Sequence, residues 1–145
     1  MDIKIKKLDE RARLPHRGSP YSAGADLCAL LDESLTIAPH ETAFIHTGLC
    51  AEIPEGYAGL VFARSSLGSK RGLAPANKVG VIDPDYRGEI MVALFNHSDE
   101  EQTVEPFERV AQLVIVPFVS ADFTESDELS DTLRGTGGFG STGRQ

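Results

Sequence analysis

The chain has 145 residues, a length that suits one domain with a sizeable core and is too short for two ordinary domains. Its formal net charge of −8 argues against a nucleic-acid polymer as partner, because such binding depends on many Lys and Arg side chains that neutralise phosphates. The 14 Gly and 8 Pro residues predict many turns and few long helices, so an all-β fold is favoured.

Short apolar segments follow one another along the chain, and turn residues separate them. We expect strands around Ile3 and Ile5, Leu35 and Ile37, Phe44 and Ile45, Leu49 and Ile53, and over residues 59–62, 79–82, 89–95 and 110–116. This spacing is typical of a sandwich, a barrel or a jelly roll. One or two helical turns are expected only around residues 124–133, where the apolar period is weak.

The composition changes abruptly near residue 130, which divides the chain into a β core over residues 1–129 and a flexible glycine-rich tail over 130–145. The tail matches the G-x-G-x-x-G pattern of dinucleotide-binding folds, but too few residues follow it for the required helix and acidic residue, so that fold is excluded. The tail is either a disordered terminus or a lid over a nucleotide. Arg134 and Phe139 favour the lid, because they offer a charge for phosphates and a flat face for a base.

The two cysteines, Cys28 and Cys50, lie among apolar and small residues, with no second Cys or His at metal-binding spacing. We expect buried free thiols and no zinc site, and a single disulfide stays open as the alternative. The N-terminal residues alternate apolar and charged side chains and lack the apolar core of a signal peptide, and no stretch approaches the length of a membrane span. A cytoplasmic protein without a membrane partner is therefore expected.

Three polar groups interrupt or follow apolar segments. Arg64, Ser65 and Ser66 come directly after the strand expected at 59–62, and they form either a phosphate site or a polar turn. Asp26 lies among small apolar residues and is either a buried structural carboxylate or part of the shell around a hydrated Mg²⁺ ion. Gln112 lies inside an apolar strand and is either a ladder-facing residue or a phosphate donor.

An acidic turn that contains proline joins two apolar segments between residues 80 and 90. Asp85 and Gly88 suit a turn for backbone reasons alone. Asp83 differs because it ends an apolar strand, where a carboxylate partly removed from water can act as a general base. Tyr86 packs either on a sugar or in the core.

Taken together, the segments around Asp26, Arg64, Asp83 and Gln112 and the tail from Arg134 resemble, in order and spacing, the five sequence motifs of the trimeric dUTPase family. The resemblance implies an all-β jelly roll of the dUTPase (β-clip) type and a homotrimer in which the glycine-rich arm of one subunit closes a neighbouring active site. It also implies a Mg²⁺-dependent dUTP diphosphatase, a hydrolase of nucleotide metabolism that converts dUTP to dUMP and pyrophosphate. Such an enzyme keeps uracil out of DNA and supplies dUMP for thymidylate synthesis.

The same resemblance implies a role for individual residues. Asp83 would bind the substrate and activate the water that attacks the α-phosphate, and Asp26 would touch a hydrated Mg²⁺ ion that the substrate phosphates chiefly hold. The other implied substrate-binding residues are Arg64, Ser65, Ser66, Gln112 and Arg134 at the phosphates, Asn77, Val81 and Ile82 at the uracil edge, Tyr86 at the deoxyribose with Met91 nearby, Phe139 on the uracil face, and Gly140 and Ser141 in the closing tail.

Two departures from the family's common pattern keep a rival open, because Ser66 stands where Gly is usual and Ala63 stands where Pro is frequent. The Arg-Ser-Ser and Ile-Asp-Pro sequences also resemble the related dCTP deaminases. Those enzymes carry a catalytic glutamate at the position of Ala93, so deamination by this chain would lack its proton shuttle. A non-catalytic trimeric β-sandwich that binds a partner protein is a further alternative, which explains the strands but not the tail.

Overall fold

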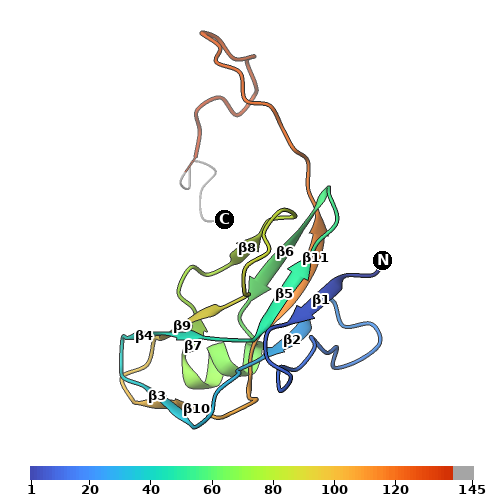
Figure 1. The fold of residues 1–145 in the computed structure, drawn as a ribbon. Coiled ribbons are helices and arrows are strands. Elements are labelled where there is room, and N and C mark those ends of the chain that lie inside the picture. Colours follow the sequence, from blue (N-terminus) through green and yellow to red (C-terminus); the bar gives the residue numbers. More distant parts are fainter. Residues whose placement is uncertain (139–145) are drawn as a thin grey trace.

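The computed structural model describes residues 1–138, and the expected substrate-binding residues Phe139, Gly140 and Ser141 lie outside this range. Within it, eleven strands and one short π-helix, η1, form an all-β body from which the last residues extend (Figure 1). The all-β prediction is therefore confirmed. The elements are β1 (Lys4–Lys7), β2 (Ala25–Cys28), β3 (Leu35–Ile37), β4 (Thr42–Ile45), β5 (Leu49–Glu52), β6 (Tyr57–Phe62), η1 (Leu67–Arg71), β7 (Leu73–Pro75), β8 (Gly80–Ile82), β9 (Val92–Asn96), β10 (Gln102–Val104) and β11 (Arg109–Pro117).

The strands pair antiparallel in four sheets. The largest sheet has the order β2-β11-β6-β8, the second has the order β4-β9-β7, and two strand pairs, β1-β5 and β10-β3, complete the body. β11 is the longest strand and lies between β2 and β6, which places Gln112 beside Asp26 on one side and beside Phe62 on the other. The largest sheet therefore carries or adjoins most of the polar residues that the sequence singles out.

The interior is filled by aliphatic side chains from almost every strand. Burial alternates along β9, where Val92, Leu94 and Asn96 point inward and Ala93 and Phe95 are only half-buried. This alternation follows from the two-residue period of a strand. Asn96 is the polar exception, and its amide Nδ2 donates to the Ile37 carbonyl at 3.0 Å, among other partners. Because its hydrogen bonds are made inside the protein, this buried amide is compatible with the core.

Glycine is required within β6 because the strand packs closely on its neighbours. A Cβ atom at Gly59 would lie 2.8 Å from Ile53 Cδ1 and 3.3 Å from Ile82 Cβ. Gly59 pairs with Ile82 in the β6–β8 ladder. The missing side chain therefore lets β8 lie close to the core at the residue that precedes Asp83.

The helical expectation at residues 124–133 is wrong, because that segment contains no helix and is exposed throughout. A short helix with no apolar surface to cover is unstable in water. The helix lies instead at η1, where Leu67 is buried and Gly72 ends the helix with a φ of 67° and an N–H that donates to the Leu67 carbonyl. No helix within residues 1–138 is long and apolar enough to cross a membrane.

Several strand boundaries differ from those expected. The segment expected at 89–95 enters the ladder only at Val92, because residues 89 and 90 bond to the β4–β5 turn and to the first residue of β5 instead. The strands β2, β7 and β10 were not expected, since each is three or four residues long and shows no clear apolar alternation. The other expected segments lie in β1, β3, β4, β5, β6, β8 and β11.

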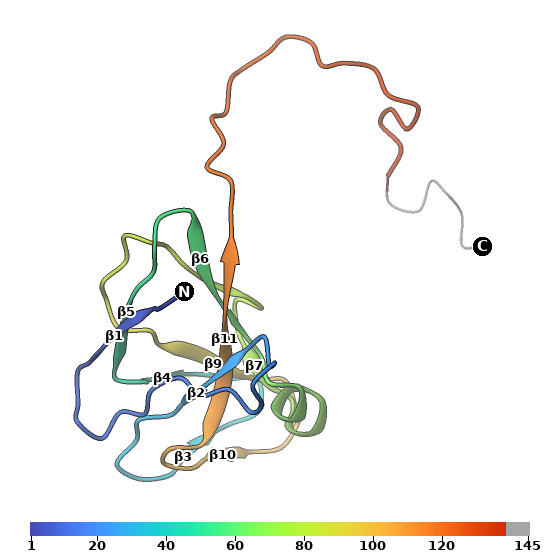
Figure 2. The same ribbon diagram turned by 90° about the vertical axis from the view of Figure 1, so that its right-hand side faces the viewer.

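The chain leaves the body where β11 ends. Phe118 still donates its N–H to the Gly56 carbonyl at 3.0 Å, and residues 119–136 are exposed. Two views at right angles show this segment extended away from the strands (Figures 1 and 2). Its exposed side chains include the apolar residues Phe123, Leu129 and Leu133. The tail expected from residue 130 thus continues a longer exposed segment, which we call the arm (residues 118–138).

Both cysteines are free thiols, as the sequence predicts. Cys50 is buried, whereas Cys28 at the end of β2 is half-buried. Burial raises the pKa of the Cys28 thiol above its ordinary value. This thiol therefore remains protonated at neutral pH.

Candidate functional site

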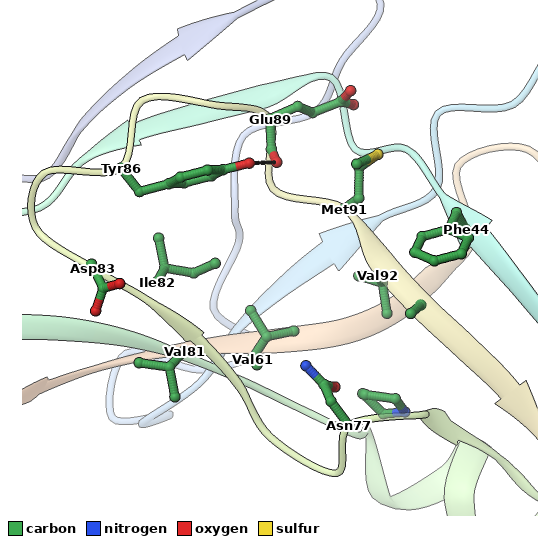
Figure 3. A pocket seen from close by; sticks show the side chains of 13 residues that line it. Phe44, Val61, Asn77, Val81, Ile82, Asp83, Tyr86, Glu89, Met91 and Val92 are labelled. Carbon is green, nitrogen blue, oxygen red and sulfur yellow. Dashed lines mark hydrogen bonds between the residues drawn. The ribbon is translucent and has the colours of Figure 1, made fainter.

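A pocket of about 320 Å³ lies beside β8, and we call it the β8 pocket. It is formed by β4, β6, β7, β8 and β9 and by the loops that flank β8 (Figure 3). Apolar side chains make up most of its wall, and a few polar groups interrupt them. The lining residues are Phe44, Val61, Pro75, Asn77, Gly80, Val81, Ile82, Asp83, Tyr86, Glu89, Met91, Val92 and Ala93.

Asp83 and Tyr86 lie on one tight turn at the end of β8. The Asp83 carbonyl accepts the Tyr86 N–H at 3.2 Å, which brings both side chains to the same end of the pocket (Figure 3). The Tyr86 hydroxyl donates to the Glu89 carbonyl at 3.0 Å. The Tyr86 ring folds back over Gly88 so closely that a Cβ atom there would lie 2.3 Å from the hydroxyl oxygen. Glycine at position 88 is therefore needed for this ring position.

Asn77 occupies the turn between β7 and β8. Lys78 adopts a φ of 66° in this turn, and its N–H donates to the Pro75 carbonyl at 2.9 Å. The Asn77 side chain is exposed to the pocket, where it points from the β7–β8 loop toward the apolar wall (Figure 3). A carboxamide offers both a donor and an acceptor. An apolar pocket with one such group is suited to a flat heterocycle that has alternating donors and acceptors on its edge.

The β8 pocket has no carboxylate at position 93. Ala93 lies in β9 opposite Phe44 of β4, and both residues line the pocket. Of the two acidic residues in the lining, Glu89 is already bound by the Gly48 N–H at 2.7 Å and by the His46 ring at 2.8 Å. Asp83 is thus the lining carboxylate left to act on a bound molecule.

A second, smaller and more polar pocket of about 210 Å³ lies where β2 and β11 meet the chain after β6, and we call it the Arg64 pocket. Asp26 Oδ1 accepts a hydrogen bond from Arg64 Nε at 2.8 Å, and Asp26 Oδ2 accepts one from Arg109 Nη1 at 3.1 Å. The lining residues are Gly18, Ser22, Gly24, Asp26, Arg64, Ser65, Arg109 and Gln112. Two guanidinium groups and one carboxylate leave an excess of positive charge, which suits an anion such as a phosphate.

Gln112 reaches the Arg64 pocket because Gly24 leaves room for it. A Cβ atom at Gly24 would lie 2.2 Å from Gln112 Oε1. The Gln112 amide Nε2 donates to the Ala63 carbonyl at 2.9 Å, which holds the side chain next to the end of β6. Gln112 thus takes part in the ladder of β11 and also lines the Arg64 pocket with its side chain.

The geometry does not supply a preformed cage for a metal ion. No group of three or more His, Cys, Asp or Glu side chains within residues 1–138 is arranged to hold one. Both Asp26 oxygens bind arginines, which makes Asp26 a poor direct ligand. These residues fit a hydrated Mg²⁺ ion that a polyphosphate carries, because Mg²⁺ keeps several waters and is often held chiefly by substrate phosphates.

The expected site residues therefore fall into two groups that share no lining residue. Asn77, Val81, Ile82, Asp83, Tyr86 and Met91 line the β8 pocket, and Asp26, Arg64, Ser65 and Gln112 line the Arg64 pocket. Ser66 lines neither pocket and immediately precedes η1. Arg134 also lies apart, in the arm, where its Nε donates to the Gly137 carbonyl at 2.7 Å.

Several residues that line the two pockets were not among the predicted site residues, and Phe44, Glu89 and Arg109 are examples. Arg109 and Gln112 are three positions apart, so a regular strand would place them on opposite faces. A bulge between Arg109 and Ala111 shifts the register of β11 against β2 and allows both side chains to line one pocket. The sequence signal for this residue was a basic side chain, Arg109, three positions before Gln112. The bulge that brings Arg109 into the pocket could not be predicted from the sequence.

Comparisons with known proteins identify the family of the chain. The family model described as dUTPase matches residues 10–143. The deoxyuridine 5'-triphosphate nucleotidohydrolase of Thiobacillus denitrificans is 47% identical over 146 residues and covers 100% of both chains. A mutant dUTPase of Staphylococcus bacteriophage 80alpha with dUpNHpp has a TM-score of 0.89 and 30% identity, with 98% of each chain covered. A mutant dUTPase of phage phi11 of S. aureus, described with a structural Mg(II) ion, has a TM-score of 0.77 and 28% identity, with 88% of this chain and 98% of that chain covered. The chain thus belongs to the dUTPase family.

Proposed function

We propose that this protein hydrolyses dUTP to dUMP and pyrophosphate, with the nucleoside in the β8 pocket and the phosphates at an Arg64 pocket. The observation that carries the proposal is the position of Asp83, a carboxylate at the mouth of an apolar pocket that also presents one carboxamide. Family membership and the full-length similarity to a deoxyuridine 5'-triphosphate nucleotidohydrolase support the same reaction. The reaction would keep uracil out of DNA and supply dUMP.

The β8 pocket binds uracil and deoxyribose in this proposal. The Asn77 amide and the backbone at Val81 and Ile82 read the uracil edge, since they lie along one side of the pocket. Tyr86 packs against the deoxyribose, where its held ring leaves no space for a 2′-hydroxyl. Met91 lies in the wall near the sugar.

Asp83 acts as the general base. It follows β8 directly, so the β6–β8 ladder fixes the backbone from which its exposed carboxylate extends. The carboxylate takes a proton from a water molecule, whose oxygen forms a bond to the α-phosphorus while the bond to the pyrophosphate oxygen breaks. Positioning of the water and neutralisation of phosphate charge lower the barrier, because phosphoryl transfer needs little covalent help from a protein.

The Arg64 pocket binds the phosphates. Arg64 and Ser65 donate to phosphate oxygens, Gln112 approaches the α-phosphate, and Ser66 contributes its hydroxyl only if the start of η1 adjusts. Mg²⁺, when bound by the triphosphate, neutralises its charge and polarises the phosphate oxygens. Asp26 orients Arg64 and would contact the hydrated ion only through water.

The complete site belongs to a homotrimer in which neighbouring subunits complement one another. Two observations support this arrangement. The β8 pocket and the Arg64 pocket share no lining residue, and the arm carries exposed apolar residues away from the body of its own subunit (Figure 2). In the trimer the arm and the residues that follow it close a neighbouring site, with Arg134 at the triphosphate, Phe139 on the uracil ring and Gly140 and Ser141 around the phosphates.

A substrate panel tests the proposed function. The full chain is incubated with Mg²⁺ and, in turn, with dUTP, dCTP, dTTP, UTP and dATP, and pyrophosphate and ammonia are measured. We expect pyrophosphate from dUTP at a rate far above that from the other nucleotides, and no ammonia. Ammonia from dCTP would instead identify a deaminase, and no turnover of any nucleotide would support a binding protein without catalytic activity.

A further inference from the structure

The segment that contains Glu89 and Met91, which line the β8 pocket, is anchored to the first residue of β5 and to the turn that precedes it. Ile90 donates its N–H to the Leu49 carbonyl at 2.8 Å, and its own carbonyl accepts a hydrogen bond from the Thr47 hydroxyl at 2.6 Å. Ile90, Leu49 and Thr47 are all buried. These hydrogen bonds therefore form part of the core and hold the chain just after Glu89.

Glu89 adds an anchor through its side chain. Its Oε1 accepts the Gly48 N–H at 2.7 Å, and its Oε2 lies 2.8 Å from His46 Nδ1. The Glu89 side chain is only 18% exposed, whereas the His46 side chain is 57% exposed. Burial opposes ionisation, but the hydrogen bonds from His46 and Gly48 outweigh it and hold the pKa of Glu89 below its ordinary value. The carboxylate is thus charged and fixed at neutral pH.

The same residue holds Tyr86 through its backbone. The Glu89 carbonyl accepts the Tyr86 hydroxyl at 3.0 Å, while the Glu89 carboxylate points away from the ring (Figure 3). Gly88, which directly precedes Glu89, lies under the ring of Tyr86. The position of the Tyr86 hydroxyl therefore depends on the Glu89 carbonyl. The anchored Glu89 side chain in turn helps to fix the position of that carbonyl.

We propose that Glu89 is a positioning residue that, through Tyr86, determines how strictly the β8 pocket excludes a 2′-hydroxyl. This inference rests on the proposed function, in which Tyr86 packs against the deoxyribose. A pocket side chain such as Tyr86 excludes a 2′-hydroxyl only if it is held in place, because a mobile side chain can move away from the hydroxyl at little energetic cost. Release of Glu89 from Gly48 and His46 frees the carbonyl that holds the ring, and the pocket then accepts a ribonucleotide more readily.

The test compares kcat/KM for dUTP and UTP in the full-length protein and in single variants. We expect Glu89→Ala to lower the dUTP-to-UTP ratio of kcat/KM about tenfold, mainly because kcat/KM for UTP rises. A change of about tenfold corresponds to the loss of one buried hydrogen-bonded group. Glu89→Gln is expected to keep the ratio near that of the parent protein. Its amide oxygen still accepts the Gly48 N–H, and its amide nitrogen can donate to His46 Nδ1.

Glu108→Ala is the matched control. Glu108 is similarly covered, with 22% of its side chain exposed, and it also pairs with one cation and one backbone N–H, since it binds Arg71 at 2.5 Å and the Glu105 N–H at 3.0 Å. It has no contact with Tyr86, so its loss should lower stability without changing the dUTP-to-UTP ratio. A change in this ratio of the same size for Glu108→Ala and Glu89→Ala would overturn the proposal.

Tyr86→Phe provides a test that does not depend on the folding of Glu89→Ala, because Tyr86 is a partly exposed residue and only its hydroxyl is removed. We expect Tyr86→Phe also to lower the ratio of kcat/KM for dUTP to that for UTP. In the double variant with Glu89→Ala, the fold decrease in this ratio should be smaller than the product of the two single fold decreases. An unchanged ratio in Tyr86→Phe, or full additivity, would overturn the role of Glu89. Failure of the parent protein to hydrolyse dUTP would instead reject the proposed function itself.

Discussion

Asp26 and Arg64 form an ion pair in which the carboxylate Oδ1 accepts a hydrogen bond from Nε at 2.8 Å, and only 13% and 20% of the two side chains are exposed. The other carboxylate oxygen binds Arg109. One carboxylate between two arginines orients both guanidinium groups and leaves donors free for a phosphate. This geometry gives Asp26 a task that does not require direct contact with a metal ion.

Asp26→Asn should weaken dUTP binding and reduce stability. The amide neutralises neither arginine, so two like charges are left close together without their anion. We expect the KM for dUTP to rise about tenfold and the free energy of unfolding to fall by about 1–3 kcal/mol, as measured by steady-state kinetics and urea unfolding. Asp32→Asn is the control, because Asp32 forms an exposed ion pair with Arg11 and should be silent in both measurements. Unchanged kinetics in Asp26→Asn would contradict the assigned role.

Asp83→Asn should nearly abolish turnover and leave dUTP binding largely intact. The amide has a similar shape but cannot take a proton from water, and loss of a general base typically lowers kcat about 10²- to 10⁴-fold. Single-turnover kinetics and equilibrium binding of dUTP would separate the two effects. Asp85→Asn, in the same turn but outside the β8 pocket, should retain kcat. Retained turnover in Asp83→Asn would remove Asp83 as the base.

The Glu89 carboxyl should make stability depend on pH. Its pKa in the folded protein lies below the ordinary value of 4.5, so its charged form stabilises the fold above that value, and the contribution is lost as the pH falls through the folded-state pKa. The difference in unfolding free energy between the parent protein and Glu89→Gln should thus be constant near pH 7 and shrink below about pH 4.5. Urea unfolding across this range measures it.

Glu52→Gln is the control for that measurement. The Glu52 carboxyl also has a pKa below its ordinary value, because it accepts a hydrogen bond from Lys4, but half of its side chain is exposed. Water and salt screen such a pair, so its contribution should be small and should fall as salt is added. A pH dependence that is larger in Glu52→Gln than in Glu89→Gln would contradict the distinction between the two pairs.

Gly59→Ala should destabilise the sheet and disturb the β8 pocket. The added methyl group would lie 2.8 Å from Ile53 Cδ1 and 3.3 Å from Ile82 Cβ, so these side chains must move. We expect a loss of about 1–3 kcal/mol in the free energy of unfolding. Gly68→Ala in η1 is the control, because its new Cβ atom would meet no atom closer than 3.9 Å. Equal effects of the two substitutions would show that close packing at Gly59 is unimportant.

Deletion of residues 134–145 should leave a folded protein with much reduced dUTP hydrolysis. The last strand, β11, ends at Pro117, and the fold does not depend on contacts from residues 119–136, since all of these are exposed. Circular dichroism and thermal unfolding should match the full chain, whereas kcat/KM should fall because the site can no longer close. Unchanged kinetics would show that the tail is only a terminus.

Local features of the sequence were enough to predict one half of the candidate site. Residues 79–82 are apolar and are followed by Asp83 and a proline turn, so the strand, its end and the position of the carboxylate all follow from neighbouring residues. The all-β fold and the free thiols were also predictable from local sequence features, namely short apolar segments separated by turn residues and cysteines that lie among apolar and small residues. The helix was placed wrongly because its stability depends on burial, which Leu67 has and residues 124–133 lack.

Only the tertiary structure decided which distant side chains meet. Asp26, Arg64 and Arg109 come from three separate parts of the chain, and a bulge that no local pattern reveals brings Arg109 into the pocket. Likewise, His46 and Glu89 meet across 43 positions, because β4 pairs with β9 and their flanking turns are thereby brought together. The sequence by itself indicated most of the strands and the residues with reactive groups, since these depend on local backbone and side-chain chemistry. Sheet pairing and register determined how those groups are combined.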